Sequence, residues 1–151
     1  MVAVGQNSRT YSIRDVAALT GLPASTLRYY ESIGVTPQID RGETSGHRVY
    51  SEDDLDLLTW VACLAATEMP VAKMREYLAN CRAGADSAAQ QIELLRTQDA
   101  HLADQAAQIV VRRRYIQLKM TYWDAVRAGD ARRVEELAEQ AAALAERLRR
   151  H

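Results

Sequence analysis

The stretch Thr26-Leu27-Arg28-Tyr29-Tyr30-Glu31 decides how the first half of this 151-residue chain folds. Leu27 and Tyr30 stand three residues apart, the spacing of one helix face, so they predict a short helix with a buried side. Pro23 suits the first turn of that helix, and Gly34 ends it. The other positions of the helix carry an arginine and a second tyrosine.

Another helix is expected just upstream. Ser12, followed three residues later by Asp15, makes a capping-box pattern that opens a helix. Ile13 and Val16 begin its apolar face, and Gly21 stops it. Two short helices joined by a tight turn predict a helix-turn-helix.

The segment from Val35 to Tyr50 has the composition of a hairpin. It holds Pro37, Gly42 and Gly46, a density of chain breakers that is typical of turns. Ser51-Glu52-Asp53-Asp54 then repeats the capping-box pattern, with acids at the positive end of the next helix. This layout predicts a winged helix-turn-helix, so double-stranded DNA is the first partner to consider.

Two more helices follow the hairpin. The first, from Leu55 to Ala66, is apolar nearly all round and includes Cys63, so we expect it to be covered on more than one side. Pro70 opens the second, from Val71 to about Leu78, and Gly84 breaks it.

From Asp86 onward the chain carries a heptad repeat. Its seam positions alternate between spacings of four and three over about five heptads, which predicts a coiled coil. The seam consists of Ala88, Ile92, Leu95, Asp99, Leu102, Ala106, Ile109, Arg113, Ile116, Met120 and Trp123. Gly129-Asp130 breaks this helix and caps a last one, which repeats in the same way from Val134 to Leu148.

Two charged residues interrupt the seam. Asp99 and Arg113 lie seven residues to either side of Ala106. In an antiparallel pair of chains centred on Ala106, Asp99 of one chain meets Arg113 of the other, whereas a parallel pair stacks like charges. We therefore predict an antiparallel homodimer, in which this pair sets the register more than it adds stability. Alternatively, both side chains lie at the seam edge and touch only water.

Composition bounds the class of protein. Apolar residues make up 48% of the chain, and the few Pro (3) and Gly (7) lie mostly in the first half, which favours a mainly α fold. The chain holds no 18-residue apolar run, its first ten residues lack a signal-peptide pattern, and its two Cys make no disulfide framework. We expect a cytoplasmic protein.

The net charge of the chain gives no support to DNA binding, because 19 basic residues are balanced by 20 acidic ones. Locally placed arginines therefore have to provide the attraction to DNA.

Several motifs at fixed spacing resemble the mercury-resistance-regulator (MerR) family. They are Tyr11-Ser-Ile-Arg-Asp-Val-Ala17, the stretch from Thr26 to Glu31, Gly34, Arg41, Gly46-His-Arg-Val-Tyr50, Ser51-Glu-Asp-Asp-Leu55 and Met69-Pro-Val with Met74-Arg-Glu-Tyr-Leu78. The resemblance implies a winged helix-turn-helix with a helical hairpin over 1–80 and a dimerisation helix over 86–123. A short C-terminal helix over 130–151 completes the expected domains.

The resemblance also implies a function. It implies a transcription regulator, without enzymatic activity, that binds a near-palindromic operator in double-stranded promoter DNA as a homodimer. RNA polymerase is the expected partner at the promoter. In the presence of an effector such a dimer bends and untwists the DNA to activate transcription, so that the energy of deformation is part of the mechanism.

Seven residues are candidate DNA contacts. They are Arg14, Ser25, Thr26, Arg28, Tyr29, Arg48 and Tyr50. The hydroxyls and guanidinium of the second helix suit base edges or phosphates, and the others suit phosphates that fix the register. The alternatives are that Arg28 pairs with Glu31 and that Tyr50 belongs to the hairpin core; we expect Tyr30 to pack in the core.

The sequence does not point to a metal or a cofactor. Metal-sensing family members place two Cys just past the long helix, whereas this chain has none after Cys81 and only His101 and His151 as late ligands. The four-Cys iron–sulfur arrangement is also absent. No nucleophile–base motif or phosphate loop supports an enzyme.

Cys63 is the candidate effector-sensing residue. Its context, Val61-Ala-Cys-Leu-Ala-Ala-Thr-Glu-Met-Pro70, resembles a branch of the family whose single third-helix Cys responds to aldehydes or other thiol-reactive electrophiles. This chemistry needs an accessible thiolate, which Lys73 or a helix end would stabilise. The alternative is that Cys63 is an ordinary packed side chain.

Two other readings remain open. Trp60, Tyr115, Tyr122 and Trp123 either line a pocket for a small apolar ligand, roofed by the final helix, or pack at an interface. A coiled-coil interaction module that no longer binds DNA is the alternative to a regulator, and the neutral charge balance is its only support.

Overall fold

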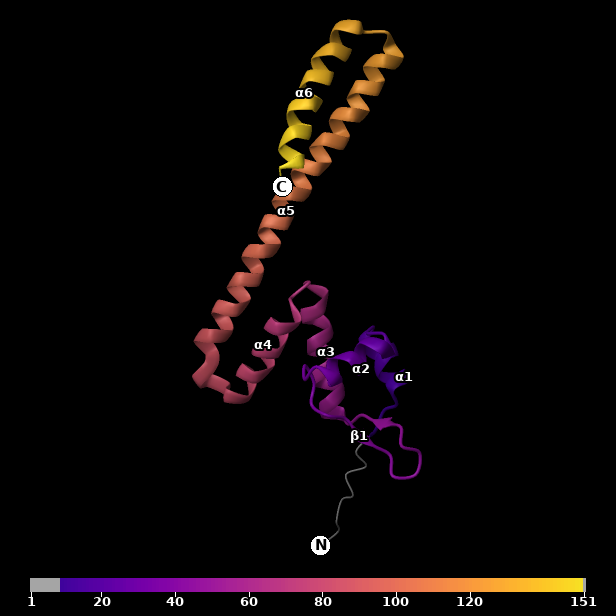
Figure 1. The fold of residues 1–151 in the computed structure, drawn as a ribbon, viewed down its shortest axis with the longest axis vertical. Coiled ribbons are helices and arrows are strands. Elements are labelled where there is room, and N and C mark those ends of the chain that lie inside the picture. Colours follow the sequence, from indigo (N-terminus) through magenta and orange to yellow (C-terminus); the bar gives the residue numbers. More distant parts are fainter. Residues whose placement is uncertain (1–8, 151) are drawn as a thin grey trace. The chain divides into compact units, whose positions relative to one another are not determined.

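The computed structural model describes residues 9–150, so the ends of the first and last expected domains, residues 1–8 and 151, lie outside it. The described chain consists of helices and one small sheet (Figure 1). The elements are α1 (Ile13–Thr20), α2 (Ala24–Ser32), β1 (Asp40–Arg41), β2 (Arg48–Val49), α3 (Glu52–Ala66), α4 (Val71–Ala83), the 3₁₀ turn η1 (Gly84–Ser87), α5 (Ala88–Ala128) and α6 (Ala131–Arg149). The predicted mainly α winged helix-turn-helix fold with a long helix is confirmed.

Capping determines where the first helices begin and end. Ser12 accepts a hydrogen bond from the Asp15 N–H, and the Asp15 carboxylate accepts one in return from the Ser12 N–H, so α1 starts with a complete capping box. Gly21 ends α1 at a φ of 74°, a left-handed conformation that costs glycine little. Ser51 and Asp54 make the second predicted capping box at the start of α3.

The wing is a short antiparallel hairpin. β1 pairs with β2 in the register Asp40 with Val49 and Arg41 with Arg48. An isolated antiparallel bridge joins Tyr11 to Tyr50, so the chain that enters α1 is tied to the end of the wing.

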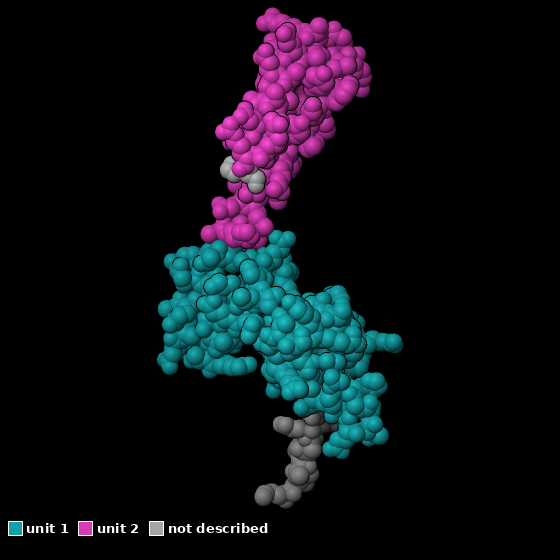
Figure 2. All heavy atoms as spheres, viewed as in Figure 1, with its two compact units in different colours: residues 1–98 teal, residues 99–151 magenta. Residues whose placement is uncertain are grey.

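Contacts divide the chain into two compact units, Met1–Gln98 and Asp99–His151 (Figure 2). The first unit has one hydrophobic core to which both helix-turn-helix helices, the wing and the following helices contribute. Its fully buried side chains include Val16, Leu27, Tyr50, Leu58, Val61 and Met74. The wing and α2 therefore share a core, which fixes how they present their outer side chains.

The first turns of α5 belong to this unit. Leu94 is buried in the same core. Gln91 donates to the Tyr77 carbonyl at 2.9 Å, and Gln98 donates to the Thr67 carbonyl at 2.7 Å. The start of the long helix is thus fastened to α3 and α4 by both packing and hydrogen bonds.

The second unit is an antiparallel helical hairpin made by the rest of α5 and α6, joined at Gly129 (Figure 1). α5 contributes a heptad row that is buried or half-buried: Val111, Tyr115, Leu118, Tyr122 and Ala125. α6 contributes Val134, Leu137, Ala141, Leu144 and Leu148, of which Leu137 and Ala141 are buried. No helix in the described part of the chain is long and apolar enough to cross a membrane.

Candidate nucleic-acid interface

Basic side chains from five segments line one groove on the first unit. The groove has a volume of about 380 Å³ and is lined by Ser12, Ile13, Arg14, Arg28, Arg41, His47 and Arg48. These residues come from the N-terminal end of α1, from α2 and from both strands of the wing and their turn. No acidic residue lines it. A groove with four arginines beside a helix N-terminus attracts anions such as phosphate.

Arg28 faces this groove without a protein partner. The predicted alternative, an ion pair between Arg28 and Glu31, does not form, because Glu31 pairs with Arg48 instead. Within residues 9–150, neither Arg28 nor Arg14 makes an ion pair or a side-chain hydrogen bond, and both side chains are exposed. Both guanidinium groups are therefore available to a ligand.

Arg48 has a structural contact in addition to its place in the groove. Its Nε donates to Glu31 Oε2 at 2.6 Å, and Glu31 Oε1 accepts from the Ile39 N–H at 3.1 Å. Burial acts to raise the pKa of Glu31, but these hydrogen bonds outweigh it, so the pKa of Glu31 is lowered. The carboxylate thus stays ionised and joins α2 to the wing.

Tyr50 is a correction to the sequence-based interpretation. Its side chain is 1% exposed, and its hydroxyl is buried without a hydrogen-bond partner among the described residues. Burial raises the pKa of Tyr50. A phosphate cannot reach this hydroxyl, so Tyr50 belongs to the hairpin core and not to the DNA contacts.

The other predicted contacts lie on α2. Ser25 is exposed and Thr26 is half-buried in the first turns of this helix. Tyr29 is 53% exposed, whereas Tyr30 is buried as expected, and their rings lie 6.1 Å apart. Tyr29 therefore keeps a free outer face next to the exposed Arg28.

Arg41 and His47 complete the groove, although neither was among the predicted contacts. Arg41 lies opposite Arg48 in the wing and donates to the Gly46 carbonyl at 3.1 Å. Hairpin register brings these residues to the same place, and a sequence without a known turn position does not give that register. The basic residues Arg41, His47 and Arg48, which flank the turn of the wing, were the available signal.

Both cysteines are exposed in the single chain. Cys63 lies on the same side of α3 as Trp60, one turn away, and Trp60 is 61% exposed. α3 packs against both α1 and α4, as the expectation of cover on more than one side requires, and the side with Trp60 and Cys63 stays exposed in the single chain. Lys73, proposed to stabilise a thiolate at Cys63, pairs with Glu76 at 2.8 Å.

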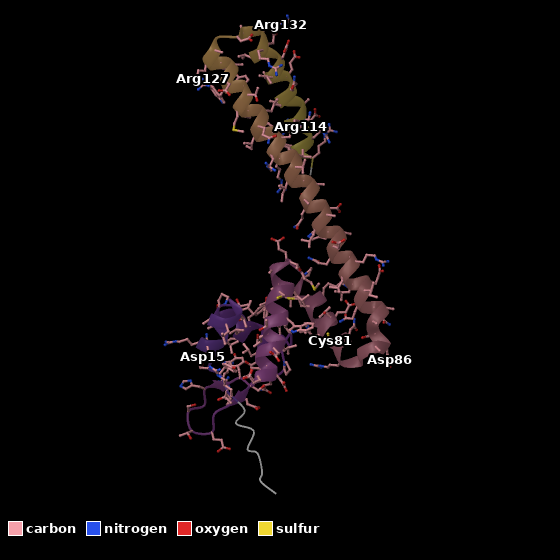
Figure 3. All side chains as sticks on the ribbon, turned by 180° about the vertical axis from the view of Figure 1, so that it is seen from behind. Asp15, Cys81, Asp86, Arg114, Arg127 and Arg132 are labelled. Carbon is pink, nitrogen blue, oxygen red and sulfur yellow. The ribbon has the colours of Figure 1, made fainter. Side chains whose placement is uncertain are left out.

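Cys81 lies near the end of α4 (Figure 3). Its sulfur accepts a hydrogen bond from Gln91 Nε2 at 3.4 Å. No group of three or more His, Cys, Asp or Glu residues in the described chain is arranged to hold a metal ion.

The four residues of the proposed aromatic pocket are divided between the two units. Tyr115 and Tyr122 lie on the row that faces α6, with Lys119 Nζ 5.9 Å and 5.4 Å from their ring centroids. Trp123 packs edge-on against Tyr122, yet it is 63% exposed on another side of the helix. Trp60 belongs to the first unit.

The predicted seam of α5 is exposed along its length. Ile92, Leu95, Leu102, Ile109, Ile116, Met120 and Trp123 are all exposed large apolar side chains. Asp99 and Arg113 are also exposed, without an ion pair inside the described chain. This row lies opposite the row that packs on α6, since positions such as 116 and 118 are separated by 200° on a helix.

Comparison with known proteins identifies the kind of domain that carries the groove. Residues 11–81 match the family model described as MerR HTH family regulatory protein. An uncharacterised HTH-type transcriptional regulator of Haemophilus influenzae is 27% identical over 122 residues, covering 79% of this chain and 87% of that protein. The regulator AdhR of Bacillus subtilis is 36% identical over 66 residues; the match spans 44% of this chain and about half of AdhR, 46%.

Solved structures share the fold. The chain resembles HiNmlR, a MerR family regulator that lacks the sensor domain and is bound to promoter DNA, with a TM-score of 0.68 and 24% identity over 85% of this chain and 96% of that one. It also resembles a MerR family regulator from Bacillus thuringiensis, with a TM-score of 0.60 and 28% identity over 74% of this chain and 97% of that one.

Proposed function

We propose that the chain is a transcriptional regulator of the MerR family and that it acts as a homodimer on a near-palindromic operator in promoter DNA. The observation that carries this proposal is the groove where Arg14 and Arg28 stand exposed and unpaired beside the wing. Two such grooves in a dimer would grip the phosphates that flank two successive major grooves. With an effector bound, the dimer would bend and untwist the operator, so that RNA polymerase meets promoter elements in register.

Binding to the DNA upstream of its own gene tests this function. We expect a gel shift with that DNA whose affinity falls steeply as salt rises, because phosphate contacts release counterions. A random duplex of the same length and base composition is the control and should bind far more weakly. If neither duplex binds at low salt, the chain is an interaction module and the regulator proposal fails.

The exposed seam of α5 supports the homodimer. A row of seven large apolar side chains does not stay in water on a stable soluble chain without a partner. A second copy placed antiparallel about Ala106 would cover the row with an identical one. The same placement would set Asp99 against Arg113 at two symmetric points, which a parallel pair would not do.

Exchanging the two charges tests the register. We expect Asp99→Arg and Arg113→Asp, each alone, to weaken the dimer about three- to tenfold, since like charges then face each other at two symmetric points. The double exchange should restore the wild-type dimer. Sedimentation velocity over a dilution series measures the dissociation constants of wild type and the three variants. If both single variants and the double variant behave alike, the pair does not set the register.

Cys63 is the proposed effector-sensing residue. Its exposure in the single chain, beside the exposed Trp60, supports access of a small electrophile. Alkylation there would place a new group on a helix whose buried side, at Leu58 and Val61, belongs to the core of the DNA-binding unit. A change at that point would be passed to α1, which packs against α3.

Run-off transcription with formaldehyde tests the sensor. We expect wild type to activate its promoter severalfold with formaldehyde and Cys63→Ser to lose that response, because serine lacks the nucleophilic thiolate. Cys81→Ser is the matched control and should respond like wild type. Equal induction in wild type and Cys63→Ser would instead direct attention to a non-covalent ligand, the alternative that Trp60 and the tyrosines of α5 raise.

A further inference from the structure

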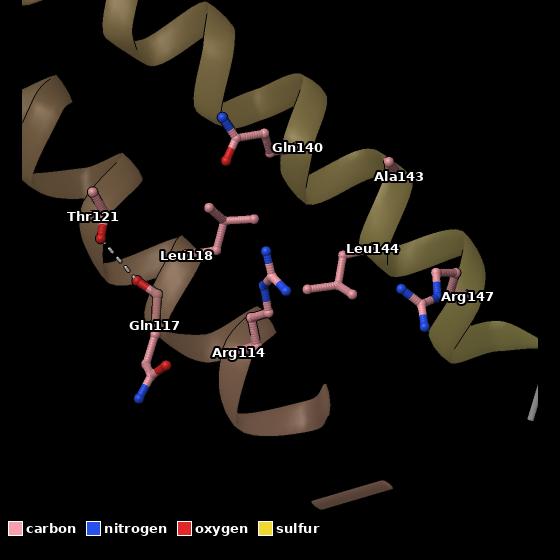
Figure 4. Close-up of a pocket in the computed structure, with 8 residues that line it drawn as sticks. All are labelled: Arg114, Gln117, Leu118, Thr121, Gln140, Ala143, Leu144 and Arg147. Atoms are coloured by element: carbon pink, nitrogen blue, oxygen red, sulfur yellow. Dashed lines mark hydrogen bonds between the residues drawn. The ribbon is translucent and has the colours of Figure 1, made fainter. Parts of the chain in front are cut away.

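A second groove lies between α5 and α6, far along the chain from the basic groove of the DNA-binding unit. It has a volume of about 530 Å³ and is open along one side. Its lining is Arg114, Gln117, Leu118, Thr121, Gln140, Ala143, Leu144 and Arg147 (Figure 4). Each helix contributes four residues at positions i, i+3, i+4 and i+7, which is one continuous helix face.

The order of these residues gives the groove a direction. Arg114 is the first of the four on α5, and Arg147 is the last of the four on α6. Because the two helices run antiparallel, both arginines lie at the same end of the groove. Leu118 and Leu144 lie in the middle, and the far end holds Thr121 and Gln140. In Figure 4 the Arg114 side chain reaches from α5 toward α6, beside Leu118 and Leu144.

In the described hairpin four arginines are ion-paired, whereas Arg114 and Arg147, like Arg113 and Arg149, are not. Arg127, Arg132, Arg133 and Arg150 each form an ion pair with a neighbouring Asp or Glu. Within the part of the chain that the structure describes, Arg114 and Arg147 form none. Although α6 carries four glutamates, no acidic residue lines the groove. Two positive charges at one end of a groove that no acidic residue lines favour the binding of an anion there.

We infer that this groove binds a small amphipathic carboxylate. Arg114 and Arg147 hold the carboxylate, Leu118 and Leu144 contact an apolar body, and Thr121 or Gln140 meets the far end. Seven residues of helix separate Arg114 from Thr121, or about 10 Å, which limits the ligand to that length. The volume is within the range of small-ligand sites. Such a ligand would bridge α5 and α6 and so stiffen the hairpin, independently of Cys63.

Calorimetric titration of the full chain tests this site. The probes are octanoate, octanol and inorganic phosphate: octanoate matches the length, the arginine end and the leucines of the groove, octanol lacks the charge, and phosphate lacks the apolar body. We expect saturable binding of octanoate only. Arg114→Gln and Arg147→Gln should each weaken it about tenfold, because each removes one charge-assisted hydrogen bond.

Arg132→Gln is the matched control, since it removes a charge from α6 at an arginine outside the groove. It should leave octanoate binding unchanged, and thermal unfolding should show all three variants folded. The inference is overturned if octanoate does not bind saturably or if octanol binds equally well. It is also overturned if phosphate binds as tightly with the same arginine dependence, or if Arg132→Gln weakens binding as much as the groove variants.

Discussion

Ile116→Glu should convert the proposed dimer into monomers. Ile116 is 58% exposed in the single chain and lies on the apolar row of α5 that we propose as the dimer interface. In the proposed antiparallel arrangement it lies ten residues past Ala106, close to the seam position of Leu95, which lies eleven residues before Ala106 in the other copy. A glutamate there would be buried without a partner, at two symmetric points in each dimer. If each costs about 2 kcal/mol, the dissociation constant rises about a thousandfold.

The matched control is Gln108→Glu. It adds the same charge to the same helix, eight residues earlier, on a side turned away from the apolar row, where Gln108 already accepts a hydrogen bond from Arg112. Sedimentation velocity should find wild type and Gln108→Glu dimeric at a concentration where Ile116→Glu is monomeric. Circular dichroism should show the same helix content in all three, since Ile116 contributes little to the fold of one chain. A dimeric Ile116→Glu would place the interface elsewhere.

Loss of the proposed dimer should also weaken the binding of operator DNA. A monomer offers one basic groove to the operator, so it forfeits the gain in affinity that comes from linking two binding units. We therefore expect Ile116→Glu to bind operator DNA at least a hundredfold more weakly, although no DNA-contacting side chain has changed. A substitution that lowered only the stability of the single chain would not weaken dimerisation and DNA binding together, so this result distinguishes a dimer interface from a purely stabilising site.

Local chemistry made much of the first unit predictable. Capping boxes and chain breakers depend on neighbours three or four residues apart, so Ser12 with Asp15, Gly21, and Ser51 with Asp54 appear where the sequence placed them. These signals fix the ends of helices. They carry no information about which outer side chains meet after the chain has folded.

The features of the site that the sequence did not predict depend on tertiary contacts. The pairing of Glu31 with Arg48 joins residues 17 apart, so it is invisible to a search for helical neighbours, and it frees Arg28. Tyr50 has the polar tip of a DNA contact, but the Tyr11 bridge draws its backbone inward and buries the ring. Residue type alone does not distinguish these two outcomes.

The long helix α5 carries two heptad rows of apolar residues, of which the sequence analysis found one. The seam through Ile109 and Ile116 was readable, but α5 carries another apolar row, through Val111 and Leu118, that packs on α6. Two rows on opposite faces overlap in sequence, so a single heptad assignment finds only one of them. The two rows together explain why so long a helix carries both an intrachain hairpin and a free face.

Arg28→Ala should weaken operator binding about ten- to a hundredfold at moderate salt. The proposed dimer would lose two guanidinium groups, each of which is proposed to make one bidentate contact with a guanine or a phosphate. If the contacts are phosphates, the slope of log affinity against log salt should also fall by about 2 for the dimer. Arg28→Lys should keep most of the slope but lose part of the affinity, because lysine retains the charge without the paired donors.

Arg82→Ala is the control for charge alone. Arg82 is an exposed arginine in the last turn of α4 and does not line the basic groove. Because the whole chain carries a formal net charge of −1, long-range attraction contributes little, and removing a distant arginine should change affinity less than twofold. Gel shifts over a salt series compare the variants. If Arg28→Ala and Arg82→Ala weaken binding equally, the position of the arginine does not matter. The groove is then not the DNA interface.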